Sequence, residues 1–326
     1  MRRLAVGVET WPIDGRFVIA RGAVTEIHVV TVGIAEAGRI GRGECRPYAR
    51  YGETPDTVVA EIEAQRSAIE GGLDRQELQN RMTPGAARNA IDCALWDLAA
   101  KQAGKPVWEL AGLPAPQPVE TAYTISIGTP AEMAAAAHRA SDRTLLKVKL
   151  SGAGDLERIE AVRAAAPASK LIVDANEAWT PATYRDLAPL LADLGIALIE
   201  QPLPAEDDMA LGMLPHPVPL CADESVHDRK DIEVLARRYE AINIKLDKTG
   251  GLTEAIELAD ASRRLGLTIM IGCMVGTSLA MAPALLLATD AAFVDLDGPL
   301  LLARDRVPGL TYMGSRVLPP SAELWG

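Results

Sequence analysis

A series of short apolar runs, each ending in charge, constrains the fold of this chain more than any other feature. Neighbouring charged ends lie roughly 22 to 50 residues apart, which is about the length of one strand–helix unit. The charged residues are, in chain order, Lys147, Lys149, Asp174, Glu200, Asp223, Lys245, Asp295 and Asp297. In a parallel (β/α) barrel the carboxyl ends of the strands meet at one mouth. The spacing therefore predicts a barrel whose mouth gathers these charges.

The segments around the charged ends alternate between strand and helix patterns. Strands are expected at residues 119–125, 145–150, 170–176, 196–202, 218–225, 241–248, 267–274 and 293–299. Helices are expected at residues 133–141, 156–167, 183–195, 231–240, 252–266 and 278–289. Eight strands joined by crossover helices indicate a parallel barrel of the TIM type.

The first part of the chain has a different pattern, typical of an α+β domain. Strands are expected near residues 4–9 and 26–35, a Gly-rich turn at 38–44, and a helix at about 54–70. A second helix is expected to begin at Thr83 and Pro84, a favourable N-cap and N1 pair, and to end near Gly104.

The length of 326 residues fits a barrel of about 250 residues together with a smaller domain. We expect an α+β domain over residues 1–115, the barrel over 116–308, and a tail over 309–326 that returns to the first domain.

Composition excludes several classes of partner. The formal net charge is -11 and no basic face is evident, which argues against a nucleic-acid binder. The N-terminus lacks a signal-peptide pattern, and no apolar run is long enough to cross a bilayer. The four cysteines are scattered without CxxC spacing, so reduced thiols in the cytoplasm are expected. A small-molecule substrate is the expected partner; the oligomeric state stays open, and a homo-oligomer is compatible with the sequence.

Three carboxylates on consecutive strands predict a cation site. Asp174, Glu200 and Asp223 would repel one another strongly unless a cation lay between them. Carboxylate oxygens with open water positions suit Mg²⁺, with Mn²⁺ as a replacement. A network of ion pairs with the nearby lysines is the alternative interpretation.

The lysines suit proton abstraction next to a carboxylate. The product of that step is an enediolate, and a mismatch of roughly ten pKa units leaves about 14 kcal/mol to be supplied. A divalent cation and lysine ammonium groups can stabilise the developing charge. Lys147 lies two residues from Lys149 on one face of a strand, where its charge can favour the neutral amine of Lys149.

Several motifs together resemble the muconate-lactonizing branch of the enolase superfamily. They are the KVK pair, the three carboxylates, NIK, the helix AIDCALWDLAAK and the GRGE segment, in the family's order and over nearly the whole chain. The resemblance implies an α+β capping domain and a modified (β/α)7β TIM barrel. It also implies one Mg²⁺ per subunit on Asp174, Glu200 and Asp223, Lys149 and Lys245 on opposite faces of the substrate, and Lys147 beside Lys149.

The DxD of the last strand resembles that of the dipeptide epimerases in this family. The wider sequence, including FVIARG, PYARYGET, DANEAW, ADES and NIKLDKTGGLTEA, is similar to the members that act on L-Ala-D/L-Glu, so this dipeptide from murein peptide turnover is the expected substrate. The resemblance implies that Asp295 and Asp297 hold the substrate ammonium group. Arg21, in a capping-domain loop, is the candidate for the side-chain carboxylate, since Arg binds carboxylates in a bidentate manner. Arg50 and Tyr51 are weaker candidates, and Cys273 is expected to line the site.

The paired lysines do not by themselves decide the reaction. An N-acylamino-acid racemase, an o-succinylbenzoate synthase or a cycloisomerase would use the same barrel and the same metal ligands. A non-catalytic binder of small molecules is the alternative from another class, although binding alone requires no lysine pair.

Overall fold

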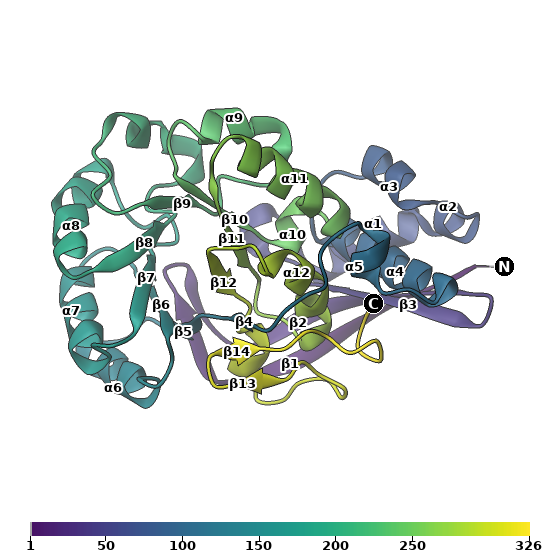
Figure 1. Cartoon of the computed structure of the whole chain (residues 1–326), viewed down its shortest axis with the longest axis horizontal. Helices are drawn as coiled ribbons and strands as arrows, with labels where there is room; N and C mark the ends of the chain where they lie inside the picture. The colour runs from purple at the N-terminus through teal and green to yellow at the C-terminus, as the bar shows by residue number, and fades with distance from the viewer. Residues whose placement is uncertain (1) are drawn as a thin grey trace.

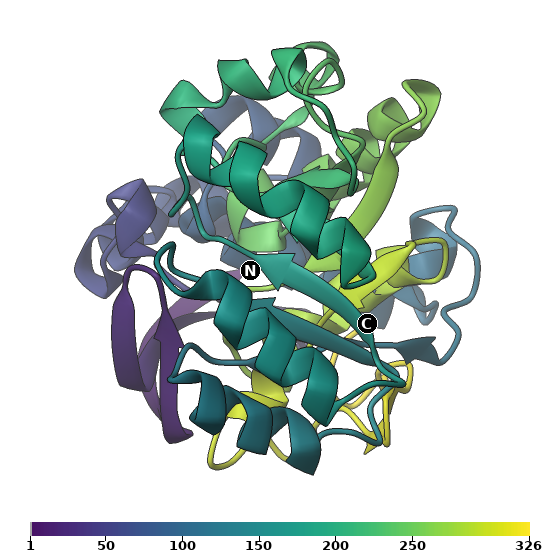
Figure 2. The same cartoon turned by 90° about the vertical axis from the view of Figure 1, so that its left-hand side faces the viewer.

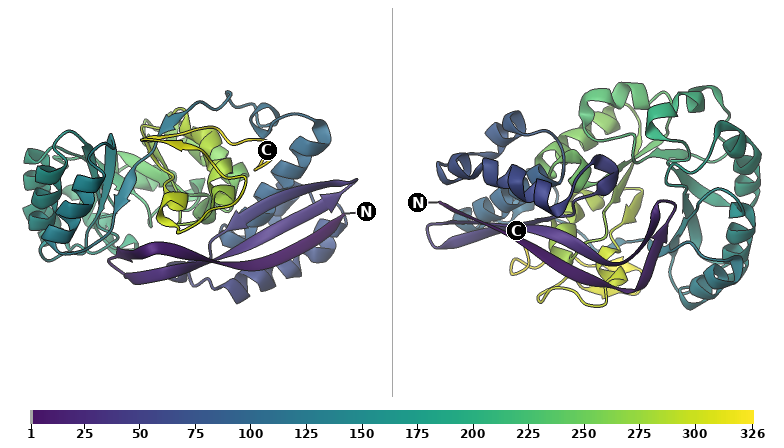
Figure 3. Two further views of the ribbon diagram at one scale, coloured as in Figure 1. Left: turned by 90° about the horizontal axis from the view of Figure 1, so that it is seen from below. Right: turned by 180° about the vertical axis from the view of Figure 1, so that it is seen from behind.

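The computed structural model describes residues 2–326 as a capping part beside a barrel (Figure 1). The capping part begins with an antiparallel sheet of β1 (Arg3–Ile19), β2 (Gly22–Glu36) and β3 (Arg39–Cys45). The long β1–β2 hairpin reaches from the capping helices to the barrel (Figure 3). There the Ile127 amide donates to the carbonyl of Val18 at 3.0 Å, so one end of the hairpin contacts the chain that follows the first barrel strand.

Helices follow the sheet of the capping part. They are η1 (Ala49–Tyr51), α1 (Pro55–Ala64), α2 (Arg66–Glu70), α3 (Arg75–Arg81), α4 (Ala86–Ala103) and α5 (Val107–Leu110). The single helix expected over residues 54–70 is therefore two helices that meet at Gln65. The helix α3 was not anticipated, although Asp74 and Glu77 form a capping box at its start.

The predicted start of the long helix at Thr83 and Pro84 is wrong. Helix α4 begins at Ala86, with Gly85 as its N-cap residue. The Ala86 amide donates to Glu53 Oε1 at 2.8 Å, so a distant carboxylate satisfies the first turn in place of a local hydroxyl.

The Gly-rich turn expected at residues 38–44 is also wrong, because most of this segment forms β3. A Cβ atom at Gly43 would lie 2.0 Å from the carbonyl oxygen of Ala90, and one at Gly41 would lie 2.1 Å from that of Ala94. These glycines let α4 approach the strand closely. In sequence alone, glycines required by such packing cannot be distinguished from glycines of a turn.

The barrel strands lie side by side in one parallel sheet. They are β5 (Tyr123–Ile125), β6 (Leu145–Lys149), β7 (Lys170–Asp174), β8 (Ile196–Glu200), β9 (Leu220–Ala222), β10 (Ala241–Ile244), β11 (Thr268–Gly272) and β12 (Phe293–Asp295). The Ala122 amide donates to the carbonyl of Val294 at 2.8 Å, which joins the two ends of the sheet. The eight-stranded sheet and its capping part confirm the predicted fold class.

Helices cover the outer face of the barrel (Figure 2). They are α6 (Pro130–Arg139), α7 (Asp155–Ala165), α8 (Pro181–Asp193), α9 (Ile232–Leu235), α11 (Leu252–Arg264) and α12 (Ser278–Ala288). The buried turn α10 (Leu246–Thr249) instead follows β10 at the mouth and packs against α4. Short 3-10 helices complete the connections: η2 (Ala205–Asp207), η3 (Met209–Met213), η4 (Arg229–Asp231) and η5 (Gly298–Leu301). Among residues 2–326, the helices are too short or too polar for one of them to cross a membrane.

The strand expected over residues 119–125 is divided between two sheets. Its first half, β4 (Val119–Glu120), pairs with β14 (Arg316–Val317), which in turn pairs with β13 (Tyr312–Met313). The chain then ends against α4, where the Trp325 indole donates to the carbonyl of Cys93 at 3.1 Å. This contact agrees with a tail that returns to the first domain, while the predicted boundaries at residues 115 and 308 stay predictions.

We expect Gly43→Ala to destabilise the protein by about 3 kcal/mol, because the added methyl group clashes with the backbone of α4. Gly33→Ala is the matched control, since a Cβ atom there meets its nearest neighbour at an ordinary 3.9 Å. Urea unfolding of both variants measures the difference. Equal stabilities would contradict the close packing of β3 on α4.

Candidate active site

The register of the parallel strands brings the predicted charges to one end of the barrel. Lys149 at the end of β6 pairs with Asp174 at the end of β7, which pairs with Glu200 at the end of β8. On the other side of the barrel, Asp295 pairs with Gly272 at the end of β11. Because parallel neighbours end at the same edge, the side chains converge at the mouth.

Three buried carboxylates converge at this mouth. One oxygen from each of Asp174, Glu200 and Asp223 lies within 4.8 Å of the other two, and all three residues are buried. Among residues 2–326, Glu200 Oε2 has no hydrogen-bond partner, although Lys147 Nζ lies 2.6 Å away. Converging carboxylate oxygens with spare acceptor capacity fit a hard divalent cation such as Mg²⁺.

Lysine ammonium groups lie against the same oxygens. Lys147 Nζ is 2.8 Å from Asp295 Oδ2, 2.6 Å from Glu200 Oε2 and 3.2 Å from Asp174 Oδ2. Lys149 Nζ is 2.5 Å from Asp174 Oδ2. The structure therefore brings the KVK pair and the carboxylates together, as predicted.

The third predicted lysine approaches from a different side. Lys245 follows β10, which β7, β8 and β9 separate from β6 in the sheet. Its Nζ atom lies 2.6 Å from Asp223 Oδ2. A substrate between Lys149 and Lys245 would present a different face to each.

Burial and charge act in opposite directions on these groups. Burial lowers the pKa of Lys147 and Lys245, but the surrounding carboxylates, above all Asp295 for Lys147 and Asp223 for Lys245, raise both pKa values well above the usual range. Burial and the charge of Asp174 raise the pKa of Glu200 to about 7. The mouth thus holds buried groups of opposite charge at ion-pair distance.

A fourth lysine completes the cluster, and sequence reasoning missed it. Lys248, on α10, is buried and donates to Asp223 Oδ1 at 2.5 Å, to the carbonyl of Asn243 at 3.0 Å and to the carbonyl of Asp223. Its position one turn after Lys245 was the available signal. Asn243 itself donates to Glu200 Oε1 at 2.8 Å, so β10 also orients a second carboxylate.

Asp295 and Asp297 both reach the mouth but have different partners. Asp295 Oδ2 faces Lys147, and its Oδ1 is buried and accepts no hydrogen bond from the part of the chain that the structure describes. Asp297 Oδ2 accepts the Thr124 amide at 2.7 Å. Burial and the nearby Asp295 raise the pKa of Asp297 to about 7. Asp295 Oδ1 is therefore an open acceptor for a cationic ligand.

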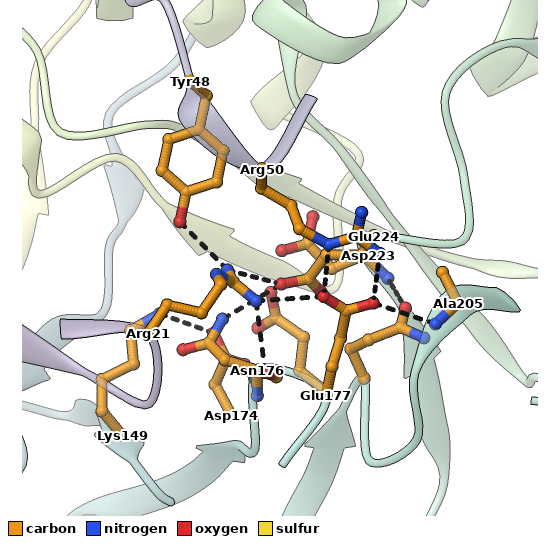
Figure 4. Close-up of polar contacts among 12 residues, drawn as sticks. Arg21, Tyr48, Arg50, Lys149, Asp174, Asn176, Glu177, Ala205, Asp223 and Glu224 are labelled. Carbon is orange, nitrogen blue, oxygen red and sulfur yellow. Dashed lines mark hydrogen bonds and ion pairs between the residues drawn. The ribbon is translucent and has the colours of Figure 1, made fainter. Parts of the chain in front are cut away.

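Arg21 lies in a charged network between the capping loops and the barrel (Figure 4). Its guanidinium is 3.1 Å from Glu177 Oε2 and 2.8 Å from Glu224 Oε1, and it donates to Tyr48 Oη at 3.0 Å. Arg50 donates to both carboxylate oxygens of Glu177, at 2.7 and 2.8 Å. The predicted cation thus reaches the mouth, but barrel carboxylates that the sequence did not reveal already hold it.

A cavity of about 360 Å³ lies under these loops. Its lining includes Arg21, Tyr51, Lys149, Lys245 and Cys273. Cys273 is half-buried, and burial raises the pKa of its thiol well above the usual range, which favours a lining role over a nucleophilic one. A larger cavity of about 750 Å³ lies elsewhere, between the hairpin, β5 and α6.

Two family models match the chain. The Mandelate racemase / muconate lactonizing enzyme, N-terminal domain covers residues 1–112, and the Enolase C-terminal domain-like model covers residues 131–299. The chain is 50% identical over 314 residues to the L-Ala-D/L-Glu epimerase of Escherichia coli (strain K12), covering 96% of this chain and 98% of that protein. It is 46% identical over 301 residues to the N-acetyl-D-glutamate racemase of a Pseudoalteromonas species, covering 91% and 95%.

Solved structures match nearly the whole chain. An enolase family member from Agrobacterium tumefaciens with homology to dipeptide epimerases, solved with sodium and L-Ala-L-Glu, has a TM-score of 0.98 and 54% identity and covers 100% of both chains. The dipeptide epimerase of Enterococcus faecalis V583, solved with Mg and L-Leu-L-Tyr, has a TM-score of 0.90 and 29% identity, covering 98% of this chain and 97% of that one.

Fold, motif order and these matches agree over nearly the whole chain. The protein therefore belongs to the mandelate racemase / muconate lactonizing enzyme family of the enolase superfamily, and it is an isomerase.

Proposed function

We propose that the protein is a Mg²⁺-dependent dipeptide epimerase that interconverts L-Ala-D-Glu and L-Ala-L-Glu from murein peptide turnover. The observation that carries this proposal is the placement of Lys149 and Lys245 on different sides of a mouth that also holds three converging carboxylates. The E. coli relative and the A. tumefaciens complex with L-Ala-L-Glu support the choice of substrate.

The lysines would carry out the proton transfers. Lys149 removes the α-proton of the C-terminal residue from one face, and Lys245 returns a proton to the other face; the roles exchange for the opposite epimer. Asp174, Glu200 and Asp223 would hold Mg²⁺, which would supply positive charge to offset the negative charge that develops on the substrate.

The remaining charged residues would orient the dipeptide. The open Oδ1 of Asp295 and the carboxyl group of Asp297 suit the substrate ammonium group. Arg21 suits the side-chain carboxylate of glutamate, which would take the place of Glu177 or Glu224 on the guanidinium. Cys273 would line the cavity beside the substrate.

Racemisation of an N-acylated amino acid is the second candidate function, because the N-acetyl-D-glutamate racemase is 46% identical to this chain. Such a substrate has no free ammonium group, so it would not require the charge of Asp295 and Asp297. The cytoplasmic setting, the single metal ion per subunit and the use of Mn²⁺ stay predictions, and the oligomeric state stays open.

Replacing either lysine by Ala should lower the epimerisation rate about 10³-fold, because each residue transfers one of the two protons. In D₂O, Lys149→Ala should retain α-proton exchange with only one epimer of Ala-Glu, and Lys245→Ala with only the other. Proton NMR of each purified epimer measures the exchange. Near wild-type epimerisation by both variants would contradict the two-base mechanism.

Asp297→Asn should lower kcat/KM for L-Ala-L-Glu about 100-fold, because the variant removes a buried charge facing the ammonium group. An Asn oxygen at this position can still accept the Thr124 amide, so the local backbone should be retained. Asp305→Asn is the control, since the Asp305 carboxylate accepts the Ser278 amide at the start of α12 and belongs to none of the proposed substrate contacts. Inhibition by N-acetyl-L-glutamate should be unchanged in both variants, and an unaltered kcat/KM in Asp297→Asn would favour the racemase.

A further inference from the structure

Gln201 has an unusual backbone conformation next to the metal site. It directly follows the predicted ligand Glu200, its side chain is buried, and its φ angle is +35°. A residue other than glycine adopts a left-handed conformation only when its surroundings hold it there. The contacts of Gln201 therefore indicate why this conformation is maintained.

The side-chain oxygen of Gln201 binds the backbone that carries another predicted ligand. Gln201 Oε1 accepts the Asp223 amide at 2.8 Å and the Ser225 amide at 3.1 Å. The backbone adds two further links, since the Gln201 amide donates to the carbonyl of Cys221 and its own carbonyl accepts the Glu177 amide, both at 2.9 Å. One residue thus joins the loops that follow β7, β8 and β9.

A buried hydrogen-bond network fixes the orientation of the Gln201 amide. Ser225 and Tyr239 both donate their hydroxyl protons to Asp208 Oδ2, at 2.6 and 2.7 Å, and Arg238 donates to Asp208 Oδ1. The two hydroxyl oxygens are left as acceptors and face Gln201 Nε2, at 2.7 and 3.1 Å. Because Nε2 must face these oxygens, Oε1 must face the amide of Asp223.

We propose that Gln201 is a positioning residue for the metal site, which sets the separation of the Glu200 and Asp223 carboxylates. A side chain fixed to the end of β8 holds the end of β9 through an oriented amide. Groups that orient metal ligands in this way typically change metal affinity when they are lost. The inference rests on the proposed Mg²⁺ site and adds a residue that does not touch the metal or the substrate.

The test is the dissociation constant for Mg²⁺, measured by isothermal titration calorimetry on protein freed of metal with a chelator. Gln201→Leu removes the amide at similar size and unchanged charge, and it should raise the dissociation constant about 10- to 100-fold. Raising the Mg²⁺ concentration should restore turnover of L-Ala-L-Glu toward the wild-type rate. A purely structural role would lower stability without shifting this concentration dependence.

Tyr239→Phe is the matched control, because it removes one hydroxyl of the same buried network while Ser225 Oγ, 2.7 Å from Gln201 Nε2, still orients the amide of Gln201. Its dissociation constant should stay within about twofold of wild type, a change of less than 0.5 kcal/mol at RT of 0.59 kcal/mol. Gln201→Met serves as a second variant where Gln201→Leu does not fold, as judged by circular dichroism.

The outcomes separate this role from the proposed function. Wild-type affinity in the folded Gln201 variant, or equal weakening in Tyr239→Phe, would overturn the role of Gln201 and leave the metal site in place. Wild-type protein that does not bind Mg²⁺ would overturn the metal site itself. Epimerisation by wild type together with weak Mg²⁺ binding in the Gln201 variant alone would support both.

Discussion

Mutual repulsion among three buried carboxylates is the constraint on which the rest of the mouth depends. Asp174, Glu200 and Asp223 each have an oxygen within 4.8 Å of the other two and have little access to water, so their charges require compensation by cations. Lysines supply that compensation in the structure, and each is itself buried at a strand end or on the following turn. Two of the lysines that neutralise the charge of the buried carboxylates, Lys149 and Lys245, are also the residues that the proposed reaction needs for proton transfer.

A second set of charges forms ion pairs between the capping part and the barrel. Arg21 and Arg50 come from loops of the capping part, and both bind Glu177, which follows β7 (Figure 4). These ion pairs hold the two arginines at the cavity that Lys149 and Lys245 also line, in a position from which they could select a substrate side chain. A substrate carboxylate would therefore compete with Glu177 and Glu224 for the guanidinium of Arg21. Selectivity for the substrate side chain would then depend on how readily these ion pairs break, as well as on the presence of an arginine.

Sequence reasoning located the barrel and its mouth because strand ends carry their charges at regular spacing, and the register then follows from parallel pairing. It failed where the determining contact is distant in sequence. Gly43 resembles a turn residue until α4 is packed against it, and the start of α4 depends on Glu53 rather than on Thr83. Lys248 and Gln201 carry no motif of their own, because their roles arise from tertiary hydrogen bonds to the loop of Asp223.

The most direct test of the account is proton NMR of L-Ala-L-Glu and of L-Ala-D-Glu in D₂O with the wild-type protein and Mg²⁺. The account predicts loss of the glutamate α-proton signal and appearance of the other diastereomer from either starting material, with the alanine α-proton retained. Unchanged spectra for both dipeptides would contradict the proposed activity. Exchange at the alanine α-carbon would contradict the assigned orientation of the substrate between Lys149 and Lys245.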